Sequence, residues 1–306
     1  MYLITGGSGF IGSHIAEALV ARGDAVRVFD NLASGFELNL AAFRDKLEFV
    51  RGDVRDPAAL AQAMHGVRYV FHEAALVSVF DSVDRPLDNH EINITGTLNV
   101  LNAARVAGVK RAVVASSAAI YGNDPALPKR EDMRPQPESP YALAKIAKEY
   151  YMSVFASLYG LETVSLRYFN VYGPRQDPKS MYSGVISKFC DVLAAGKDPT
   201  IFGDGGQTRD FIFVKDVVAA NLLAMESPGI GHGEAFNVAT GHQTSLIDLL
   251  AVLEELTGRN FTTHFQPARA GDIRHSYADV TKARQQMGFE AKYGVREGLR
   301  HLLAAR

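Results

Sequence analysis

The sequence is poor in cysteine and lacks several features that direct a chain to other compartments or ligands. Its single cysteine, Cys190, cannot form an internal disulfide, and no cysteine or histidine residues have the spacing of a zinc site, so we expect no metal. A reducing compartment fits this composition. No basic leader follows Met1, and no apolar run approaches the roughly 18 residues that a membrane span needs. These absences predict a soluble, cytoplasmic protein without a membrane partner.

The charge balance also argues against a polyanionic partner. The chain has 32 basic and 34 acidic side chains, a formal net charge of −2, and no long run of lysine or arginine. Nucleic acid is therefore not expected as a partner, and any anionic ligand must be held by a few placed groups. Of the 306 residues, 47% are hydrophobic, which predicts a well-packed interior and leaves room for two domains.

The order of apolar runs and helical patterns predicts an α/β fold. Because short strands alternate with helices through the first part of the chain, we expect a Rossmann-like, doubly wound parallel sheet with helices on both faces. The expected strands lie at residues 2–5, 25–30, 47–53, 67–75, 111–117, 160–173 and 234–241. The clearest helical patterns lie at residues 11–23, 139–159, 183–196 and 244–258.

A glycine-rich turn follows the first expected strand. The stretch TGGSGFIG places Gly6, Gly9 and Gly12 at three-residue intervals before a helix, so the backbone can approach a pyrophosphate at the helix start. Asp30 ends the second strand, where a carboxylate would accept hydrogen bonds from an adenosine ribose. Its charge also disfavours a 2′-phosphate, so NAD is expected rather than NADP. The alternative is a doubly wound fold that binds no dinucleotide.

The chain changes character after Asn170, where a loop rich in proline, glycine and polar residues begins. We predict an NAD-binding domain over 1–169, which also takes back about 213–239. A smaller, interleaved α/β domain is predicted over 170–212 and 240–306, and it would bind the substrate.

Tyr141 and Lys145 stand four residues apart in SPYALAK, on one face of the helix that begins after Ser139. An ammonium and a positively charged nicotinamide would stabilise the phenolate, so that the pair could accept a proton beside a hydride acceptor. Ser116 and Ser117 end a predicted parallel strand and could polarise the reacting oxygen. The alternative is an ordinary solvated helix face.

The same helix carries an apolar stripe at steps of three or four residues. We interpret this stripe as the face that packs on the protein core, which leaves Tyr141 and Lys145 on another face. Its members are Leu143, Ile146, Ala147, Tyr150, Val154 and Leu158.

Together these motifs resemble the extended short-chain dehydrogenase/reductases, and within them the UDP-glucose/UDP-N-acetylglucosamine 4-epimerase family. The resemblance runs nearly end to end. It rests on TGGSGFIG, GDV, HEAA, NITGTLNVL, SSAAIYG, the Tyr141/Lys145 pair, RYFNVYGPRQDP, GDGGQTRDFIFVKDVV and ARAGDIRHSYAD.

The resemblance implies a role for each matching residue. Ser117, Tyr141 and Lys145 would be catalytic, with Lys145 also holding the nicotinamide ribose. The cofactor NAD would be bound by Gly6, Gly9, Phe10, Ile11, Gly12, Asp30, Asn31, Asp53, Val54, Ala74, Ala75, Asn93, Tyr141 and Lys145. The UDP-sugar would be bound by Ser117, Tyr141, Asn170, Phe202, Arg209, Arg269, Asp272 and Ser276.

The implied reaction is a reversible 4-epimerisation of UDP-hexoses through a transient 4-keto sugar. Related dehydratases and decarboxylases carry acidic residues after the serine, whereas Ala118 and Ala119 stand here and offer no acid or base. The small Ser276 leaves room for an N-acetyl group, so we expect activity on UDP-glucose/UDP-galactose and on UDP-GlcNAc/UDP-GalNAc. The alternatives are a uronate 4-epimerase, a sugar-nucleotide reductase or a non-catalytic dinucleotide sensor.

The family also implies a homodimer. Two long helices, from about Asn93 and from Ser139, could pair with those of a second copy as a four-helix bundle.

Overall fold

The computed structural model describes residues 1–177, 184–268 and 273–305. Its main element is a seven-stranded sheet in the order β11-β6-β5-β4-β1-β2-β3, in which every neighbouring pair is parallel. The strands are β1 (Tyr2–Thr5), β2 (Val26–Asp30), β3 (Glu48–Arg51), β4 (Tyr69–His72), β5 (Arg111–Ser117), β6 (Glu162–Tyr168) and β11 (His232–Val238). The strand order reverses between β1 and β4, and ligands of such sheets bind outside the carboxyl ends of the strands at that point.

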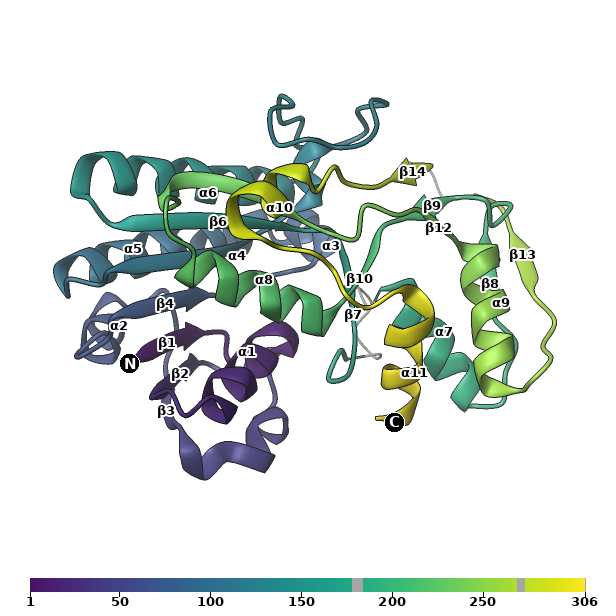
Figure 1. The fold of residues 1–306 in the computed structure, drawn as a ribbon, viewed down its shortest axis with the longest axis horizontal. Coiled ribbons are helices and arrows are strands. Elements are labelled where there is room, and N and C mark those ends of the chain that lie inside the picture. Colours follow the sequence, from purple (N-terminus) through teal and green to yellow (C-terminus); the bar gives the residue numbers. More distant parts are fainter. Residues whose placement is uncertain (178–183, 269–272, 306) are drawn as a thin grey trace.

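Helices cover both faces of this sheet (Figure 1). One face packs against α1 (Phe10–Ala21), α8 (Val214–Glu226) and α10 (Thr281–Met287). The other packs against α2 (Pro57–Ala63), α5 (Gly96–Val106) and α6 (Pro140–Tyr159). The sheet therefore lies between two hydrophobic layers, which confirms the predicted doubly wound α/β fold.

Shorter helical segments connect these elements. A π-helical turn, η2 (Glu91–Thr95), runs directly into α5, so the helix predicted from about Asn93 begins in a widened turn. The remaining short segments are η1 (Glu37–Lys46), α3 (Val79–Asp84), α4 (Pro86–His90) and η3 (Ala118–Tyr121).

The rest of the chain builds a second unit beside the main sheet, on the right in Figure 1. Its small sheets are β7 (Asn170–Tyr172) with β10 (Phe211–Phe213), β8 (Thr200–Phe202) with β13 (His264–Gln266), and β9 (Thr208–Arg209) between β12 (Thr244–Ser245) and β14 (His275–Ser276). Its helices α7 (Val185–Ala194), α9 (Leu246–Thr257) and α11 (Val295–Ala304) share a core of their own. The chain returns to the main sheet for α8 and β11 before α9 begins.

The interpretation of the apolar stripe on α6 was wrong for most of its members. Leu143, Tyr150, Val154 and Leu158 are 55%, 61%, 43% and 70% exposed, whereas Ile146 is buried. The opposite face of the helix packs on the sheet, and it buries Tyr141, Lys145, Lys148, Glu149, Met152 and Phe155. The polar groups on this face find partners on the strands beneath, so burial follows those contacts rather than hydropathy alone.

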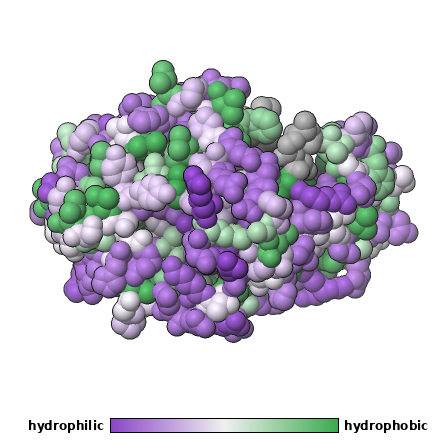
Figure 2. Space-filling view, turned by 90° about the horizontal axis from the view of Figure 1, so that it is seen from above, coloured by the Kyte–Doolittle hydropathy of each residue, from purple (hydrophilic) through white to green (hydrophobic). Residues whose placement is uncertain are grey.

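The surface seen from above mixes hydrophilic and hydrophobic residues, with the hydrophobic ones in small groups (Figure 2). None of the helices in the described ranges combines the length and apolar character needed to cross a membrane.

Candidate functional site

The glycine-rich turn between β1 and α1 is packed so closely that it admits no side chains at two positions. Gly6 has a φ of +70°, and a Cβ atom there would lie 2.6 Å from the backbone nitrogen of Ala74. A Cβ atom on Gly12 would lie 2.3 Å from the carbonyl oxygen of Gly6. The helix starts after Gly9 without a side-chain cap. This is the cradle that a pyrophosphate needs, with a helix N-terminus aimed at it.

Asp30 connects this turn to the loop after β2. Its carboxylate accepts hydrogen bonds from the backbone N–H of Ser8, at 2.9 Å, and of Leu32, at 2.8 Å. Leu32 takes a left-handed φ of +62°. The carboxylate therefore stands at the carboxyl end of β2, next to the glycine-rich turn, where the sequence predicts contact with an adenosine ribose.

Asn31 and Asp53 lie together beyond Asp30. The Asn31 Nδ2 donates to Asp53 Oδ2 at 2.9 Å, and Arg55 binds both oxygens of Asp53 at 2.9 and 2.6 Å. Hydrogen bonds from Arg55 hold the pKa of Asp53 well below its ordinary value. The sequence did not single out Arg55. Arg55 fixes the carboxylate of Asp53, which the resemblance assigns to NAD binding.

Val54 and Asn93, two further predicted cofactor residues, are both buried. A Cβ atom on Gly96 would lie 2.6 Å from the Cγ2 of Val54. The amide of Asn93 donates to the Leu76 carbonyl at 2.9 Å and to Asn89 at 2.8 Å, and it accepts from the Leu76 N–H at 3.0 Å. Asn93 therefore holds the loop after β4 with its side chain.

The remaining predicted cofactor residues line the same turn and loop. Phe10 is half-buried, and its ring lies edge-on to His14. Ile11 packs against both the core of the main sheet and the core of the second unit. Ala74 and Ala75 follow β4 and are half-buried, with Ala74 in contact with the glycine-rich turn.

The three predicted catalytic residues come from two elements. Ser117 ends β5, and its hydroxyl oxygen accepts from the Ala119 N–H at 3.1 Å. Tyr141 lies in the first turn of α6, where its N–H donates to the Ser82 hydroxyl at 3.1 Å. Lys145 Nζ lies 5.4 Å from the centre of the Tyr141 ring and donates to the carbonyl oxygen of Ala115 at 2.9 Å. The ammonium and the phenol thus meet at the carboxyl edge of the sheet.

A buried polar network behind these residues was missed by sequence reasoning. Glu149, one turn after Lys145, accepts from the Ser116 hydroxyl at 2.5 Å and from Arg167 at 2.7 and 3.0 Å. Arg167 also donates to the Tyr121 hydroxyl at 2.9 Å. Because Ser116 is engaged here, Ser117, which is half-buried, is the serine of the two whose hydroxyl stays outside this network. The network fixes β5, β6 and α6 relative to one another.

On the substrate side, the buried Asp210 connects three segments. Its carboxylate accepts from Thr240 and Gly241 at 2.8 and 2.9 Å, and from the Ala278 N–H at 3.3 Å. Its carbonyl oxygen accepts from the Asn170 N–H at 3.1 Å. Asp210 directly follows Arg209, so it joins the chain around several predicted substrate residues.

The predicted substrate residues are brought together only in part. Arg209 and Ser276 are register partners on β9 and β14, and both are half-buried. Asn170 begins β7, two residues after Tyr168, whose register partner is Ser117, one of the predicted catalytic residues. Phe202 ends β8 and is 36% exposed. Arg269 and Asp272 lie outside the described residues.

The comparisons with known proteins bear on this geometry. Residues 2–239 match the model of the NAD dependent epimerase/dehydratase family. The chain belongs to this family. It is 42% identical over 303 residues to a UDP-glucose 4-epimerase of Mycolicibacterium smegmatis, covering 97% of this chain and 95% of that protein. The family resemblance seen in the sequence is thereby confirmed.

Two solved structures share the whole fold. A UDP-N-acetylglucosamine 4-epimerase from Methanobrevibacter ruminantium, in complex with UDP-N-acetylmuramic acid, has a TM-score of 0.95 and 38% identity over 99% of this chain and 97% of that one. A UDP-glucose 4-epimerase from Thermotoga maritima, with UDP-glucose, has a TM-score of 0.94 and 40% identity over the same shares.

The residues of the cradle fit the family's cofactor. The glycine-rich turn leaves no room for side chains where phosphates would approach, and the Asp30 carboxylate is an acceptor for ribose hydroxyls. Within the described ranges, no three histidine, cysteine, aspartate or glutamate side chains gather as they would around a metal ion.

Proposed function

We propose that this protein is an NAD-dependent UDP-hexose 4-epimerase that acts on UDP-glucose/UDP-galactose and also on UDP-GlcNAc/UDP-GalNAc. The observation that carries the proposal is that Lys145 Nζ lies 5.4 Å from the centre of the Tyr141 ring and donates to Ala115 on β5, the strand that ends at Ser117. The relatives that resemble the chain over nearly its whole length are named as 4-epimerases of UDP-glucose and of UDP-GlcNAc, which supports both pairs of substrates.

NAD, when bound, would supply the acceptor for the hydride of carbon 4 and the donor that returns this hydride to the other face of the sugar. The Tyr141 phenolate takes the proton of the 4-hydroxyl and gives it back when the hydride returns, so the step needs no outside acid or base. Lys145 stabilises that phenolate, because its ammonium lies 5.4 Å from the centre of the ring. Ser117 donates a hydrogen bond to the reacting oxygen. These three residues belong to the NAD-binding domain, which we assign to residues 1–169 and 213–239.

The second unit, residues 170–212 and 240–306, would hold the nucleotide diphosphate. Arg209 presents a planar fork that suits phosphate oxygens, and Asn170, Phe202, Arg269, Asp272 and Ser276 remain its predicted partners. A grip on the diphosphate alone lets the 4-keto sugar turn over between the two hydride transfers. Ala118 and Ala119 offer no acid or base beside Ser117, so returning the hydride is the simplest fate of that sugar.

A panel of UDP-sugars followed by proton NMR tests this function. We expect UDP-galactose to give UDP-glucose, and UDP-GlcNAc to give UDP-GalNAc, each with no lasting increase in NADH absorbance. Turnover of UDP-galactose with none of UDP-GlcNAc would reject the prediction drawn from the small Ser276. Lasting NADH in proportion to the sugar added would indicate a reductase instead.

We also propose a homodimer built on the exposed apolar face of α6. Leu143, Ala147, Tyr150, Val154 and Leu158 follow steps of four, three, four and four residues, which is the spacing of packed helices. Four of these residues are more than two-fifths exposed in one copy.

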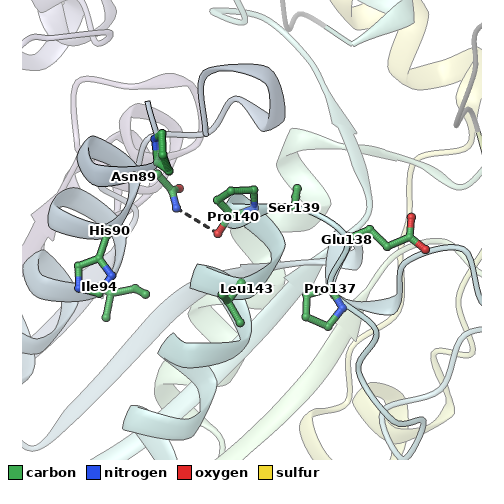
Figure 3. Close-up of a pocket in the computed structure, with 9 residues that line it drawn as sticks. Asn89, His90, Ile94, Pro137, Glu138, Ser139, Pro140 and Leu143 are labelled. Atoms are coloured by element: carbon green, nitrogen blue, oxygen red, sulfur yellow. Dashed lines mark hydrogen bonds between the residues drawn. The ribbon is translucent and has the colours of Figure 1, made fainter. Parts of the chain in front are cut away.

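The neighbouring helices α4 and α5 also carry exposed apolar residues. Leu87 on α4 and Val106 on α5 are 80% and 74% exposed. A groove between α4 and the start of α6 is lined by Asn89, His90, Ile94 and Leu143 (Figure 3). Asn89 donates to the carbonyl oxygen of Pro140 at 3.0 Å and joins the two helices there. A second copy that packs α5 and α6 against these helices would cover the apolar residues in a four-helix bundle.

Sedimentation of a charged variant tests the dimer. Leu143→Asp combined with Val154→Asp should convert the dimer to a monomer, because each copy would then bury two unpaired carboxylates in the apolar interface. Leu38→Asp is the matched control, since Leu38 is 83% exposed on η1, away from this face. A wild-type monomer, or an unchanged dimer in the double variant, would contradict the proposal.

We further propose that the enzyme acts in the cytoplasm, where its single, buried Cys190 would stay reduced. Fractionation of the source cells, followed by an activity assay of each fraction, tests this directly, and activity confined to an exported fraction would contradict it.

A further inference from the structure

The peptide group that joins Pro140 to Tyr141 is held on both sides by side chains that the mechanism above does not use. The Tyr141 N–H donates to the hydroxyl oxygen of Ser82, on α3, at 3.1 Å. The carbonyl oxygen of Pro140 accepts from the Nδ2 of Asn89, on α4, at 3.0 Å (Figure 3). Ser82 is fully buried and Asn89 is 2% exposed. One planar group, directly before the Tyr141 side chain, therefore has a partner at each end.

The helix itself offers no acceptor to the Tyr141 N–H. The first N–H groups of an α-helix lack an intrahelical acceptor, and Tyr141 is the second residue of α6. The cap of this helix, Ser139, accepts from the Ala142 N–H at 3.2 Å instead. The Ser82 hydroxyl gives its own proton to the Val79 carbonyl at 2.5 Å, so its oxygen faces Tyr141 as an acceptor. Ser82 thus satisfies a buried donor that the helix start leaves open.

Asn89 is in turn held by Asn93, in the π-helical turn η2. Asn93 Nδ2 donates to Asn89 Oδ1 at 2.8 Å, and this contact leaves the Nδ2 of Asn89 aimed at Pro140. The same Asn93 amide exchanges hydrogen bonds with both backbone groups of Leu76, at 2.9 and 3.0 Å. A series of hydrogen bonds therefore runs from the loop after β4, which contacts the glycine-rich turn, to the first turn of α6.

The position of this peptide group decides where the phenol lies. Rotation of the Pro140–Tyr141 peptide plane turns the Cα–Cβ bond of Tyr141, and the hydroxyl stands at the far end of that side chain. Lys145 is anchored separately, since its Nζ donates to Ala115 on β5. A shift of the first turn of α6 would therefore move the phenol relative to the ammonium. A displacement of about 1 Å at a reacting group can cost about a hundredfold in rate.

We propose that Ser82 and Asn89 are positioning residues that hold the Pro140–Tyr141 peptide group from both sides, and we call this pair the peptide clamp. The clamp keeps the phenol where it can exchange a proton with the 4-hydroxyl of the sugar. Both residues act through the backbone of Tyr141, and neither lies in a motif that carries the family resemblance. The clamp rests on the contacts above, and its consequence for turnover rests on the proposed function.

Hydrogen exchange of the Tyr141 amide tests the clamp without any turnover. Ser82→Ala removes only the hydroxyl, so the Tyr141 N–H should exchange about two- to tenfold faster, as expected for the loss of one hydrogen bond. Fragmentation mass spectrometry of the purified holoenzyme resolves this amide. Ser157→Ala, on the exposed side of α6, is the matched control. The Ser157 hydroxyl also donates to the carbonyl three residues earlier, so its removal should leave the Tyr141 amide unchanged.

Steady-state kinetics with UDP-galactose tests the consequence. Ser82→Ala and Asn89→Ala should each lower kcat about tenfold and leave KM within about twofold of the wild type, because they disturb the reacting geometry and not the grip on the diphosphate. The NAD content should also stay unchanged, since Asn93 keeps both of its bonds to Leu76. Placed on Tyr141→Phe, the same substitutions should lower kcat no further, because both act through the phenol. A general loss of structure would lower kcat in either background.

Faster exchange in Ser82→Ala, together with a loss of kcat that disappears on Tyr141→Phe, supports the clamp. Unchanged exchange of the Tyr141 amide, an unchanged kcat, or an equal loss of kcat on Tyr141→Phe would overturn it. Ser82→Ala is the smaller change and decides the question even where Asn89→Ala does not fold. A protein whose Tyr141 amide responds as expected but which converts no UDP-sugar would refute the proposed function and leave the clamp standing.

Discussion

The buried pair of Glu149 and Arg167 gives the sharpest prediction about stability, and we develop it through the substitution Glu149→Gln. Both side chains are about 6% exposed. Arg167 donates to the carboxylate at 2.7, 3.0 and 3.3 Å, and Ser116 donates to it at 2.5 Å. Glutamine keeps the shape, but it turns one acceptor into a donor that faces the guanidinium. The Arg167 charge is then buried without its counter-ion.

The size of the effect follows from what is lost. Two charge-assisted hydrogen bonds to Arg167 contribute about 1.5 to 3 kcal/mol each, and removing one partner of a buried pair typically costs about 3 to 5 kcal/mol. We therefore expect Glu149→Gln to lower the free energy of unfolding by about 3 kcal/mol. The network also fixes Ser116, next to Ser117, and the position of α6 on the sheet. Because α6 carries Tyr141 and Lys145, turnover should fall as well.

Urea unfolding followed by circular dichroism measures this change. The control is Glu255→Gln, which removes an exposed ion pair with Arg296 and should leave the midpoint nearly unchanged. Replacing both partners, as Glu149→Met with Arg167→Met, should recover much of the stability, because no buried charge is then left alone. The reasoning is refuted if Glu149→Gln unfolds at the same urea concentration as Glu255→Gln.

Three further predictions concern the site. Gly6→Ala should abolish NAD binding in equilibrium dialysis, because its Cβ would lie 2.6 Å from the Ala74 nitrogen. The control Gly294→Ala, whose Cβ would have no atom within 4 Å, should bind NAD as the wild type does, and equal binding by the two variants would contradict a role for the glycine-rich turn in NAD binding. Tyr141→Phe should lower kcat by a factor of about 10² to 10⁴ while the protein still binds NAD, and undiminished turnover would show that the phenol is not the base. Asp210→Asn should raise KM for the UDP-sugar about tenfold at unchanged NAD content, because the carboxylate no longer holds its loops, and an unchanged KM would reject that role.

The sequence predicted the main sheet and the cofactor turn because the signals for both are local. Strand-like runs, the glycine spacing and the carboxylate of Asp30 each lie within a few residues of the contacts they make. The helix from Ser139 was also predicted with its ends, since Ser139 caps it and Gly160 ends it in a left-handed conformation.

The inward face of α6 could not be predicted in the same way. Its residues Lys145, Lys148 and Glu149 are polar, and they are buried because they find partners on β5, β6 and the loop after β4. Those partners are distant in sequence, so no local pattern reveals them. The apolar Leu143 and Leu158 are exposed in one copy, which a second copy would explain. The pattern of apolar residues along a helix indicates which face is apolar. It does not indicate whether that face packs against the same chain or against a second copy.

The substrate side depends most on contacts between segments. Asp210 joins Asn170, Thr240 and Ala278, although no local pattern distinguishes it from other acidic residues. The roles of Arg209 and Ser276 therefore remain predictions, supported by their place on neighbouring strands. Arg269 and Asp272 remain predictions from the resemblance alone.

The measurement that tests the central claim most directly is turnover of UDP-galactose that carries deuterium at carbon 4. We predict UDP-glucose that keeps the deuterium at carbon 4, formed in ordinary water with no net NADH, because the hydride that leaves the sugar is the one that returns. Loss of the deuterium to water, or NADH accumulating with product, would contradict the account.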